Sequence, residues 1–294
     1  MNDTSRDTPA GFLYAGGAYA IWGFLPLYFK LLAQVPALEI LAHRILWSIP
    51  IAAAVLCWRG QGQALRQMLT NRTAITYTAM TAALVSVNWG IYVWAVVSGR
   101  ALETALGYYI NPLFSILLAA LLLGERLGPL QKVAIGLAVA AVVLLTWESG
   151  GVPWVSIVLP VTWGIYAYMK KTMPVEPTLG FFMEVIILSL PALALLVWLE
   201  QRGGHFLSAD ATGRLLLVGT GVMTAVPLML YALGAKLLRL STIAIMQYSA
   251  PTVVFLLAVF VFHEPFSRER LVAFALIWTA LALYSWEAIG RRRA

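Results

Sequence analysis

The strongest constraint on this chain is a succession of long apolar runs separated by short polar stretches. A helix that crosses a bilayer needs roughly 20 mostly apolar residues, because lipid cannot satisfy backbone N–H and C=O groups. Hydrophobic residues make up 61% of the sequence and charged residues 11%, whereas about a quarter of a soluble domain is charged. The sequence therefore predicts an all-α integral membrane protein. Its ten transmembrane helices are expected at residues 11–31, 36–58, 74–97, 101–122, 129–147, 152–170, 178–199, 214–235, 239–262 and 270–287.

The basic residues predict the orientation in the membrane, since cytoplasmic loops carry an excess of Lys and Arg. With a cytoplasmic N-terminus, thirteen basic residues fall inside: Arg6, Arg59, Arg66, Arg72, Arg126, Lys132, Lys170, Lys171, Lys236, Arg239, Arg291, Arg292 and Arg293. Six fall outside, and Arg44 lies within a span; the six are Lys30, Arg100, Arg202, Arg214, Arg268 and Arg270. Both termini are therefore expected in the cytoplasm. This placement in loops also argues against nucleic acid as the partner of a chain with a net charge of +7.

The residues that usually carry catalysis form no recognisable motif here. Cys57 is the single cysteine and can form no intramolecular disulfide, and the histidines are too scattered for a metal site. The nucleotide-binding motif Gly-x-x-x-x-Gly-Lys-Ser/Thr does not occur. Residues 1–10 lack the basic region and cleavage site of a signal peptide, so the first apolar run is expected to remain as a helix. We predict no enzymatic activity, no cofactor and no metal.

The two halves of the chain resemble each other when one is slid over the other. At an offset of 141, Trp22-Gly23 aligns with Trp163-Gly164, and Ser48-Ile49-Pro50 with Ser189-Leu190-Pro191. At an offset of 139, the aligned pairs are Tyr92 with Tyr231, Arg100 with Arg239, Tyr109 with Tyr248, Pro112 with Pro251 and Glu125 with Glu264. Each repeat would hold five spans, an odd number, so the second must enter the membrane from the opposite side. We expect a cytoplasmic tail at 1–10, inverted repeats at 11–149 and 150–288, and a basic cytoplasmic tail at 289–294.

Seven prolines interrupt the apolar runs: Pro26, Pro50, Pro112, Pro160, Pro191, Pro227 and Pro251. A proline removes one backbone donor and disturbs the carbonyl one turn earlier, which hydrocarbon tolerates only where other groups satisfy that carbonyl. The symmetric pairs Pro50 with Pro191 and Pro112 with Pro251 are therefore expected to act as kinks or hinges around a central cavity. The alternative is the general abundance of proline in membrane helices.

The second span carries a polar stripe. Glu39, His43 and Trp47 follow at i, i+4 and i+8 on one helix face, with Arg44 on the neighbouring stripe. An arginine at the centre of a span costs about 2.5–3.5 kcal/mol on insertion scales, so it requires a carboxylate, carbonyl groups or water inside the bundle. A structural ion pair of Arg44 with Glu39 or Glu103 is one interpretation, and a functional role in a cavity is the other.

Glu184 is the acid placed most deeply in an apolar run, and no basic residue lies within one helical turn of it. An unpaired carboxylate in such surroundings is expected to be partly protonated, which suits proton coupling or the binding of a cation. The alternative is a neutral acid with a structural hydrogen bond.

Other polar and aromatic side chains at predicted membrane depth complete the candidate cavity. Aromatic faces there could attract a cationic or planar solute, while ordinary helix packing is the alternative for each ring. The candidate cavity residues are Trp22, His43, Arg44, Asn88, Trp89, Tyr92, Glu103, Tyr109, Asn111, Trp163, Glu184, Tyr231, Gln247 and Tyr248.

Several motifs along the chain resemble one family, the RarD branch of the EamA-type permeases. The motifs are AYAIWG (18–23) with Pro26 and YFK (28–30), EIL (39–41) with HR (43–44) and WS (47–48), NW (88–89), WAV (94–96), LGY (106–108) with INPL (110–113), GER (124–126), PL (227–228), LRLST (238–242), QY (247–248) and PT (251–252) with FLLAV (255–259). The resemblance covers nearly the whole chain. It implies the drug/metabolite transporter fold, with ten helices in two inverted five-helix repeats, both termini cytoplasmic and a central cavity.

The expected function is that of a secondary transporter in a bacterial inner membrane. Its resemblance to permeases and exporters implies a small organic metabolite as substrate, an amino acid or related amine, moved by alternating access through the central cavity. Membrane lipid and a coupled proton are the other expected partners. A channel or a membrane-embedded enzyme is the alternative, and saturable counterflow separates a carrier from a channel.

The predicted orientation can be tested by cysteine labelling in intact cells. After replacement of Cys57 by Ala, single cysteines within residues 201–212 should react with an impermeant maleimide added outside, and those within 59–72 should not. Labelling of 59–72 with protection of 201–212 would invert the topology.

Overall fold

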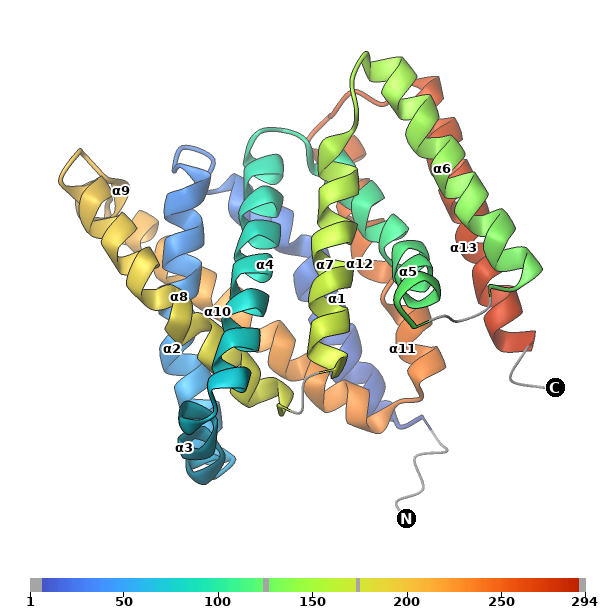
Figure 1. The fold of residues 1–294 in the computed structure, drawn as a ribbon. Helices are drawn as coiled ribbons and strands as arrows, with labels where there is room; N and C mark the ends of the chain where they lie inside the picture. Colours follow the sequence, from blue (N-terminus) through green and yellow to red (C-terminus); the bar gives the residue numbers. More distant parts are fainter. Residues whose placement is uncertain (1–6, 124–126, 173–174, 291–294) are drawn as a thin grey trace.

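The computed structural model describes residues 7–123, 127–172 and 175–290, and these fold into helices joined by short loops (Figure 1). Residues Arg6, Arg126 and 291–293, which contribute to the predicted charge bias, lie outside the described residues. The helices are α1 (Pro9–Lys30), α2 (Ala37–Trp58), α3 (Gly62–Thr70), α4 (Arg72–Val97), α5 (Ala101–Leu123), α6 (Pro129–Ser149), α7 (Trp154–Thr172), α8 (Pro177–Glu200), α9 (His205–Ser208), α10 (Ala211–Leu237), α11 (Leu240–Met246), α12 (Ser249–Leu256), the π-helical segment η1 (Leu257–Val261) and α13 (Arg268–Gly290).

Six helices are long and apolar enough to cross a membrane among the described residues: α1, α2, α4, α6, α8 and α10. The other predicted spans coincide with α5, α7, α13 and the segment formed by α11, α12 and η1. The amphipathic helix α3 was not expected from the sequence, because it has only nine residues and is too polar to stand out as an apolar run. The chain is an all-helical, multi-pass membrane protein.

The prolines affect their helices differently. Pro50, Pro112 and Pro191 each lie inside a continuous helix, whereas the predicted span 239–262 is broken at Gln247 and Tyr248. Helix α12 begins at Ser249, so Pro251 lies in its first turn. The N–H groups of a first turn have no acceptor within the helix, so the missing N–H of proline costs no hydrogen bond there. Pro251 therefore lies just after a break in its predicted span, whereas its symmetric partner Pro112 lies within the continuous helix α5.

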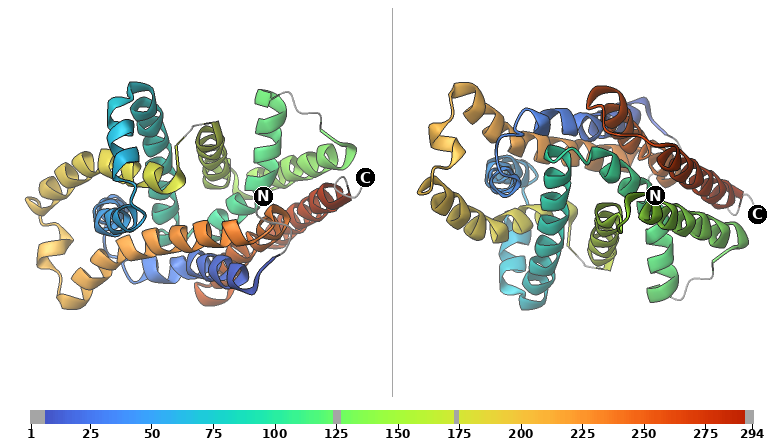
Figure 2. Two further views of the ribbon diagram at one scale, coloured as in Figure 1. Left: turned by 90° about the horizontal axis from the view of Figure 1, so that it is seen from below. Right: turned by 90° about the horizontal axis from the view of Figure 1, so that it is seen from above.

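The helices form an elongated bundle. Viewed along the bundle, α6 and α13 lie side by side at one edge, and α8, α9 and α10 lie at the other (Figure 2). Between these edges α2 packs against α8 and α10, α4 against α7 and α8, α1 against α10 and α12, and α5 against α7 and α12. The start of α1, the end of α13 and α3 lie at the lower end in Figure 1, while α9 lies at the upper end.

Buried carboxylates at the helix ends hold separate elements together. Glu264 accepts hydrogen bonds from the backbone N–H groups of Ala101 (2.7 Å) and Leu102 (2.8 Å), the first residues of α5. A carboxylate suits this position, because unpaired N–H groups and the helix dipole both favour negative charge there. Burial raises the pKa of the Glu264 carboxyl above its usual value, against the lowering effect of these two hydrogen bonds.

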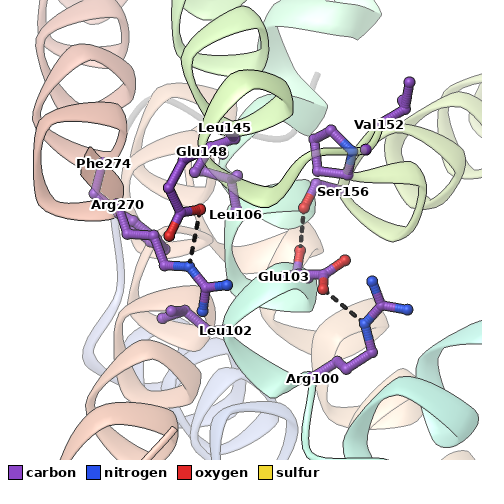
Figure 3. Close-up of a pocket in the computed structure, with 12 residues that line it drawn as sticks. Arg100, Leu102, Glu103, Leu106, Leu145, Glu148, Val152, Ser156, Arg270 and Phe274 are labelled. Atoms are coloured by element: carbon purple, nitrogen blue, oxygen red, sulfur yellow. Dashed lines mark hydrogen bonds and ion pairs between the residues drawn. The ribbon is translucent and has the colours of Figure 1, made fainter. Parts of the chain in front are cut away.

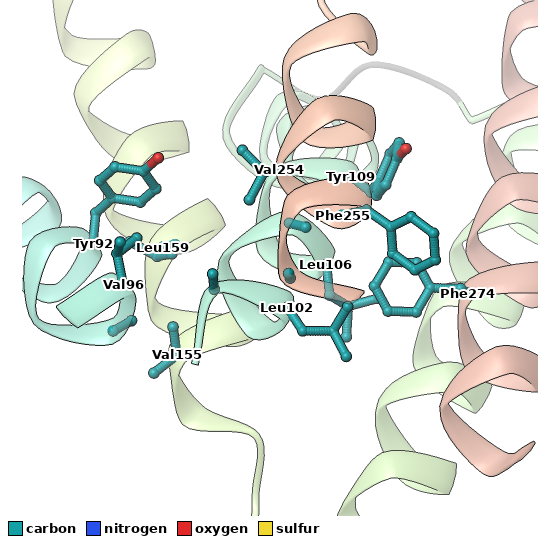
Figure 4. Close-up of a cluster of buried hydrophobic side chains, with 14 of the residues drawn as sticks. Tyr92, Val96, Leu102, Leu106, Tyr109, Val155, Leu159, Val254, Phe255 and Phe274 are labelled. Carbon is teal, nitrogen blue, oxygen red and sulfur yellow. The ribbon is translucent and has the colours of Figure 1, made fainter. Parts of the chain in front are cut away.

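The interior contains one large apolar cluster and three smaller ones. The large cluster joins α1, α4, α5, α7, α12 and α13 around residues such as Phe29, Leu106, Phe255 and Phe274 (Figure 4). Large apolar side chains also face outward, including Leu13, Trp147 and Leu190. Because lipid tails are as apolar as these side chains, association of the helices depends on close packing and on polar contacts between helices.

Helices α2 and α10 approach most closely at Gly221. A Cβ atom there would lie 2.2 Å from the carbonyl carbon of Trp47 and 2.3 Å from its oxygen, so no side chain fits without moving a helix. Ser48 crosses the same contact, since its hydroxyl donates to the Arg44 carbonyl at 2.6 Å and lies 3.4 Å from the Gly221 carbonyl. This contact sets the position of Arg44 relative to α10.

Gly221→Ala should lower the thermal stability of the purified protein, because the added methyl group must push α10 away from the α2 backbone. Overpacking of this kind costs about 1–3 kcal/mol. Gly136→Ala in α6 is the matched control, since nothing lies within 4 Å of the added methyl group there. Melting curves of the two variants in one detergent should therefore differ, with Gly221→Ala well below Gly136→Ala. Equal melting temperatures would show that the two helices are not held at this distance.

Candidate functional site

Arg44 occupies a buried position between α2 and α10. Its side chain is 5% exposed, and its Nε donates to the Thr224 hydroxyl at 2.6 Å. The guanidinium carbon lies 4.4 Å from the centre of the Trp89 ring and 5.7 Å from that of Phe29. Tyr92 and Tyr108 are its other electrostatic neighbours. Aromatic faces stabilise a cation, so these rings replace part of the water that Arg44 would otherwise bind.

Neither predicted carboxylate pairs with Arg44. Glu39 accepts hydrogen bonds from the backbone N–H (2.9 Å) and the ring Nδ1 (2.8 Å) of His205. Glu103 accepts from Arg100 Nε at 2.7 Å. The expectation of an ion pair between Arg44 and Glu39 or Glu103 was therefore wrong. Both acids bind other partners at the upper end of the bundle. Helix periodicity shows which residues share a helix face, but it does not show which side chains of other helices they meet.

His43 lies beneath the short helix α9. Its Nδ1 accepts a hydrogen bond from Trp47 Nε1 at 3.2 Å, and its ring lies 4.8 Å from the Phe206 ring. Glu200 holds α9 from the other side, because its carboxylate accepts from the backbone N–H of Phe206 at 2.9 Å. Together with the Glu39–His205 contact, these interactions close the upper end of the bundle above α2.

Glu184 is paired, in contrast to the prediction from its local sequence. Lys170 of α7 lies 3.1 Å from its carboxylate, and the Thr81 hydroxyl donates to the same oxygen at 2.7 Å. The Tyr166 hydroxyl donates to the other oxygen at 3.2 Å. The prediction failed because it considered only residues on the same helix, while all three partners come from α4 and α7.

The Arg44 and Glu184 centres occupy related places in the two halves. The offset of 141 that aligns the repeats pairs His43 with Glu184 and Phe29 with Lys170. In one half a cation is surrounded by aromatic rings, and in the other a carboxylate is paired with a lysine. Neither Phe29 nor Lys170 was predicted as a site residue, although the repeat alignment pairs them with each other.

Asn88 of α4 connects to α7, and Trp163 lies on α7 beside the Glu184 centre. The Asn88 side-chain nitrogen donates to the Leu159 carbonyl at 3.0 Å and to the Thr162 hydroxyl at 2.8 Å. The Trp163 ring lies 5.4 Å from the ring of Tyr166, which bonds Glu184. Asn88 therefore lies at the contact between α4 and α7, while Trp163 packs against a residue that binds Glu184.

Trp22 and Tyr231 form a separate aromatic cluster with Tyr19. The ring centres of these three residues lie 5.7–6.0 Å apart, and the Tyr19 hydroxyl lies 3.5 Å from the Ile243 carbonyl of α11. Tyr19 was missed by the sequence analysis, because its aligned position in the second half is Pro160.

The residues at the two prolines of α5 and α12 lie apart from Arg44. The Tyr109 hydroxyl shares a 2.6 Å hydrogen bond with Thr252, and its ring packs against Phe274 and Trp278 of α13. Tyr92 and Tyr109 lie at opposite sides of the apolar cluster (Figure 4). Tyr248 is likewise next to α13, near Tyr284. Asn111 and Gln247 lie in the same α5–α12 region. Among the described residues, neither of them is a neighbour of Arg44.

Glu103 lines a pocket of about 150 Å³ at the upper end of the bundle (Figure 3). Two ion pairs border this pocket, Arg100 with Glu103 at 2.7 Å and Arg270 with Glu148 at 3.5 Å. The Ser156 hydroxyl also donates to the Glu103 carbonyl at 2.9 Å. The structure thus assigns Glu103 to this pocket rather than to the surroundings of Arg44. Within the described residues, no three His, Cys, Asp or Glu side chains come together as possible metal ligands.

Removal of Lys170 alone should destabilise the protein more than removal of the whole pair. Glu184 is 1% exposed, so Lys170→Met leaves a buried carboxylate without its cation, which costs about 3–5 kcal/mol in buried pairs. The double variant Lys170→Met/Glu184→Gln should recover most of that loss. Melting temperatures of the two single variants and the double variant test this. A double variant less stable than Lys170→Met would show that the pair does not act as a unit.

Comparison with known proteins identifies the family. The model of the EamA-like transporter family matches the chain twice, over residues 9–147 and 150–286. The protein RarD of Streptomyces exfoliatus is 41% identical over 96% of this chain and 90% of its own length. The transporter YojE of Bacillus subtilis is 40% identical over 98% and 97%. A crystal structure at 22% identity aligns with a TM-score of 0.60 over 96% of this chain and 98% of the other, a likeness that concerns the fold alone. The chain therefore belongs to the RarD branch of the EamA-like transporter family and is a membrane transporter.

Proposed function

We propose that this protein is a secondary transporter that moves a small organic metabolite, an amino acid or related amine, by alternating access. In this proposal ten spans form two inverted repeats in a bacterial inner membrane, with both termini in the cytoplasm. Substrate is bound between the halves, and a proton is the candidate coupling ion.

The neighbour relations of the helices support the inverted repeat. If α1, α2, α4, α5 and α6 correspond to α7, α8, α10, the α11–α12–η1 segment and α13, the most extensive packing contacts have counterparts, although the α2–α4 contact has none of similar extent between α8 and α10. The α1–α10 contact then corresponds to α7–α4, and α2–α10 to α8–α4. The α2–α8, α5–α12 and α6–α13 contacts correspond to themselves, as a two-fold relation requires. Folds of this type bind substrate near the midplane, where the repeats meet.

The observation that carries the proposal is the burial of two charged side chains, Arg44 and Glu184, one in each half. They are 5% and 1% exposed, and each lies inside an apolar helix. Charge at membrane depth is costly, about 2.5–3.5 kcal/mol on insertion scales, and generally marks a substrate or ion pathway. Both lie on helices that pack across the seam, since α2 contacts α8 and α10.

The closed upper end indicates which movement alternating access would require. Phe206 covers His43, and Glu39 and Glu200 bind the backbone of α9. For the upper side to open, α9 must separate from α2 while these carboxylates exchange backbone partners for water. In this proposal the structure corresponds to a state closed at that end.

Counterflow in proteoliposomes tests the transport proposal. Vesicles loaded with unlabelled amino acids should take up the same radiolabelled amino acid transiently above equilibrium, and the initial rate should saturate with concentration. Empty liposomes are the control. A rate that rises linearly without counterflow would support a channel, and no uptake of any amino acid or amine would overturn the proposed substrate class.

Glu184→Gln should abolish any dependence of the counterflow or uptake rate on pH and lower the rate steeply. The substitution retains shape and hydrogen bonding but removes the group that titrates, while Thr81 and Tyr166 remain as partners. Glu269→Gln is the matched control, because Glu269 is exposed at the start of α13. Rates are compared at two pH values in vesicles of equal protein content. Unchanged rates and pH dependence would assign Glu184 to structure and remove it from proton coupling.

A further inference from the structure

Arg44 is a buried cation without a counter-charge among the described residues. Six described acids have a basic partner, and the pairs are Asp7 with Arg239, Glu39 with His205, Glu103 with Arg100, Glu148 with Arg270, Glu176 with Arg59 and Glu184 with Lys170. Four more hold backbone N–H groups: Glu200 on α9, Asp210 on α10, Glu264 on α5 and Glu287 on α6. The last, Glu269, is exposed on α13. Every described carboxylate is therefore placed elsewhere.

The guanidinium is also incompletely hydrogen-bonded. Thr224 accepts from Nε, and the terminal nitrogen Nη1 is buried without a hydrogen-bond acceptor. Arginine presents five N–H donors in a planar fork, and this fork matches the two oxygens of a carboxylate. The rings of Trp89 and Phe29 contact the guanidinium through their faces and offer no lone pair to that fork.

A structural role does not account for this arrangement. Fastening α2 to α10 through Thr224 needs one donor, which a neutral amide would supply without a buried charge. The close approach at Gly221 and the Ser48 hydroxyl already hold the same two helices together. A charged group that is walled by aromatic rings, poorly hydrated and unpaired attracts an anion strongly, because the surrounding dielectric is low.

We propose that Arg44 binds the carboxylate of the transported solute, so that the substrates are organic acids or amino acids and not simple amines. The proposal rests on the transport function proposed above and narrows its substrate class. Between substrates, the aromatic rings of Phe29 and Trp89 hold the cation in place.

A thermal-shift experiment with matched ligands tests this assignment. The probes are the common L-amino acids as free acids, their carboxamides, and the amines that correspond to their decarboxylation. Chloride and inorganic phosphate form a separate arm. A ligand that binds only the folded protein raises its melting temperature in proportion to its affinity and concentration. At least one free acid should raise the melting temperature of the wild type, and its amide and amine should not.

Variants then locate the binding group. Arg44→Gln should lower the apparent affinity for that acid on the order of 10- to 100-fold, the range expected for hydrogen bonds to a charged group. Arg44→Lys, which keeps the charge but loses the fork, should fall between. Arg202→Gln is the matched control, because Arg202 also lies over a tryptophan ring, that of Trp198 at 4.2 Å, yet it is exposed to solvent. Its ligand response should equal that of the wild type.

Each other result has a defined meaning. Amides or amines that stabilise as well as the acids, or an undiminished response of Arg44→Gln, would overturn the role of Arg44 while leaving transport of amino acids or amines standing. Stabilisation by chloride or phosphate alone would overturn the assignment to an organic carboxylate. No response of the wild type to any amino acid or amine would overturn the proposed substrate class itself. If Arg44→Gln does not fold, Arg44→Lys and the comparison of acid with amide on the wild type decide the question.

Discussion

The absence of water in the bilayer core is the constraint on which the rest of this structure depends. Every backbone polar group at that depth must find a partner within the protein, which restricts the spanning segments to helices. The same requirement explains the contacts at the helix ends. Glu264 satisfies the first N–H groups of α5, and Glu39 and Glu200 satisfy those of α9. Glu264 and Glu39 each bind the start of a helix more than 160 positions away in sequence, so capping of these helix ends also joins distant elements.

Close packing of the helices contributes the rest of their association in the membrane. Without a hydrophobic driving force between helices in lipid, small residues that let backbones approach become important. Gly221 allows α10 to reach the Trp47 backbone, and Gly234 allows it to reach Ala15 of α1, where a Cβ atom would lie 2.7 Å from the Ala15 nitrogen. Helix α10 is therefore bound to both α1 and α2. Its Thr224 hydroxyl is placed at Arg44 as a consequence.

Arg44 and Glu184 show two different solutions to burying charge. Glu184 has a lysine and two hydroxyl groups around it, so its surroundings are complete without a ligand. Arg44 has one hydroxyl and a set of ring faces, which stabilise a cation without neutralising it. At the offset of 141 Glu184 aligns with His43, the residue before Arg44, so the two charges lie at neighbouring and not at equivalent positions of the repeat.

Sequence by itself determined the helical, membrane-embedded class, the positions of the long helices to within a few residues and the family, because hydrophobicity and motifs are local properties of the chain. Only the tertiary structure decided which charged groups meet. Lys170 was counted only as a basic residue at the cytoplasmic end of a predicted span, and its contact with Glu184 of α8 was not expected. Glu39 lies one helical turn from Arg44 but turns to His205, a residue 166 positions away. An ion pair depends on a separation of a few ångströms between side chains of different helices. That separation is set by helix packing, such as the contact at Gly221, and no local pattern encodes it.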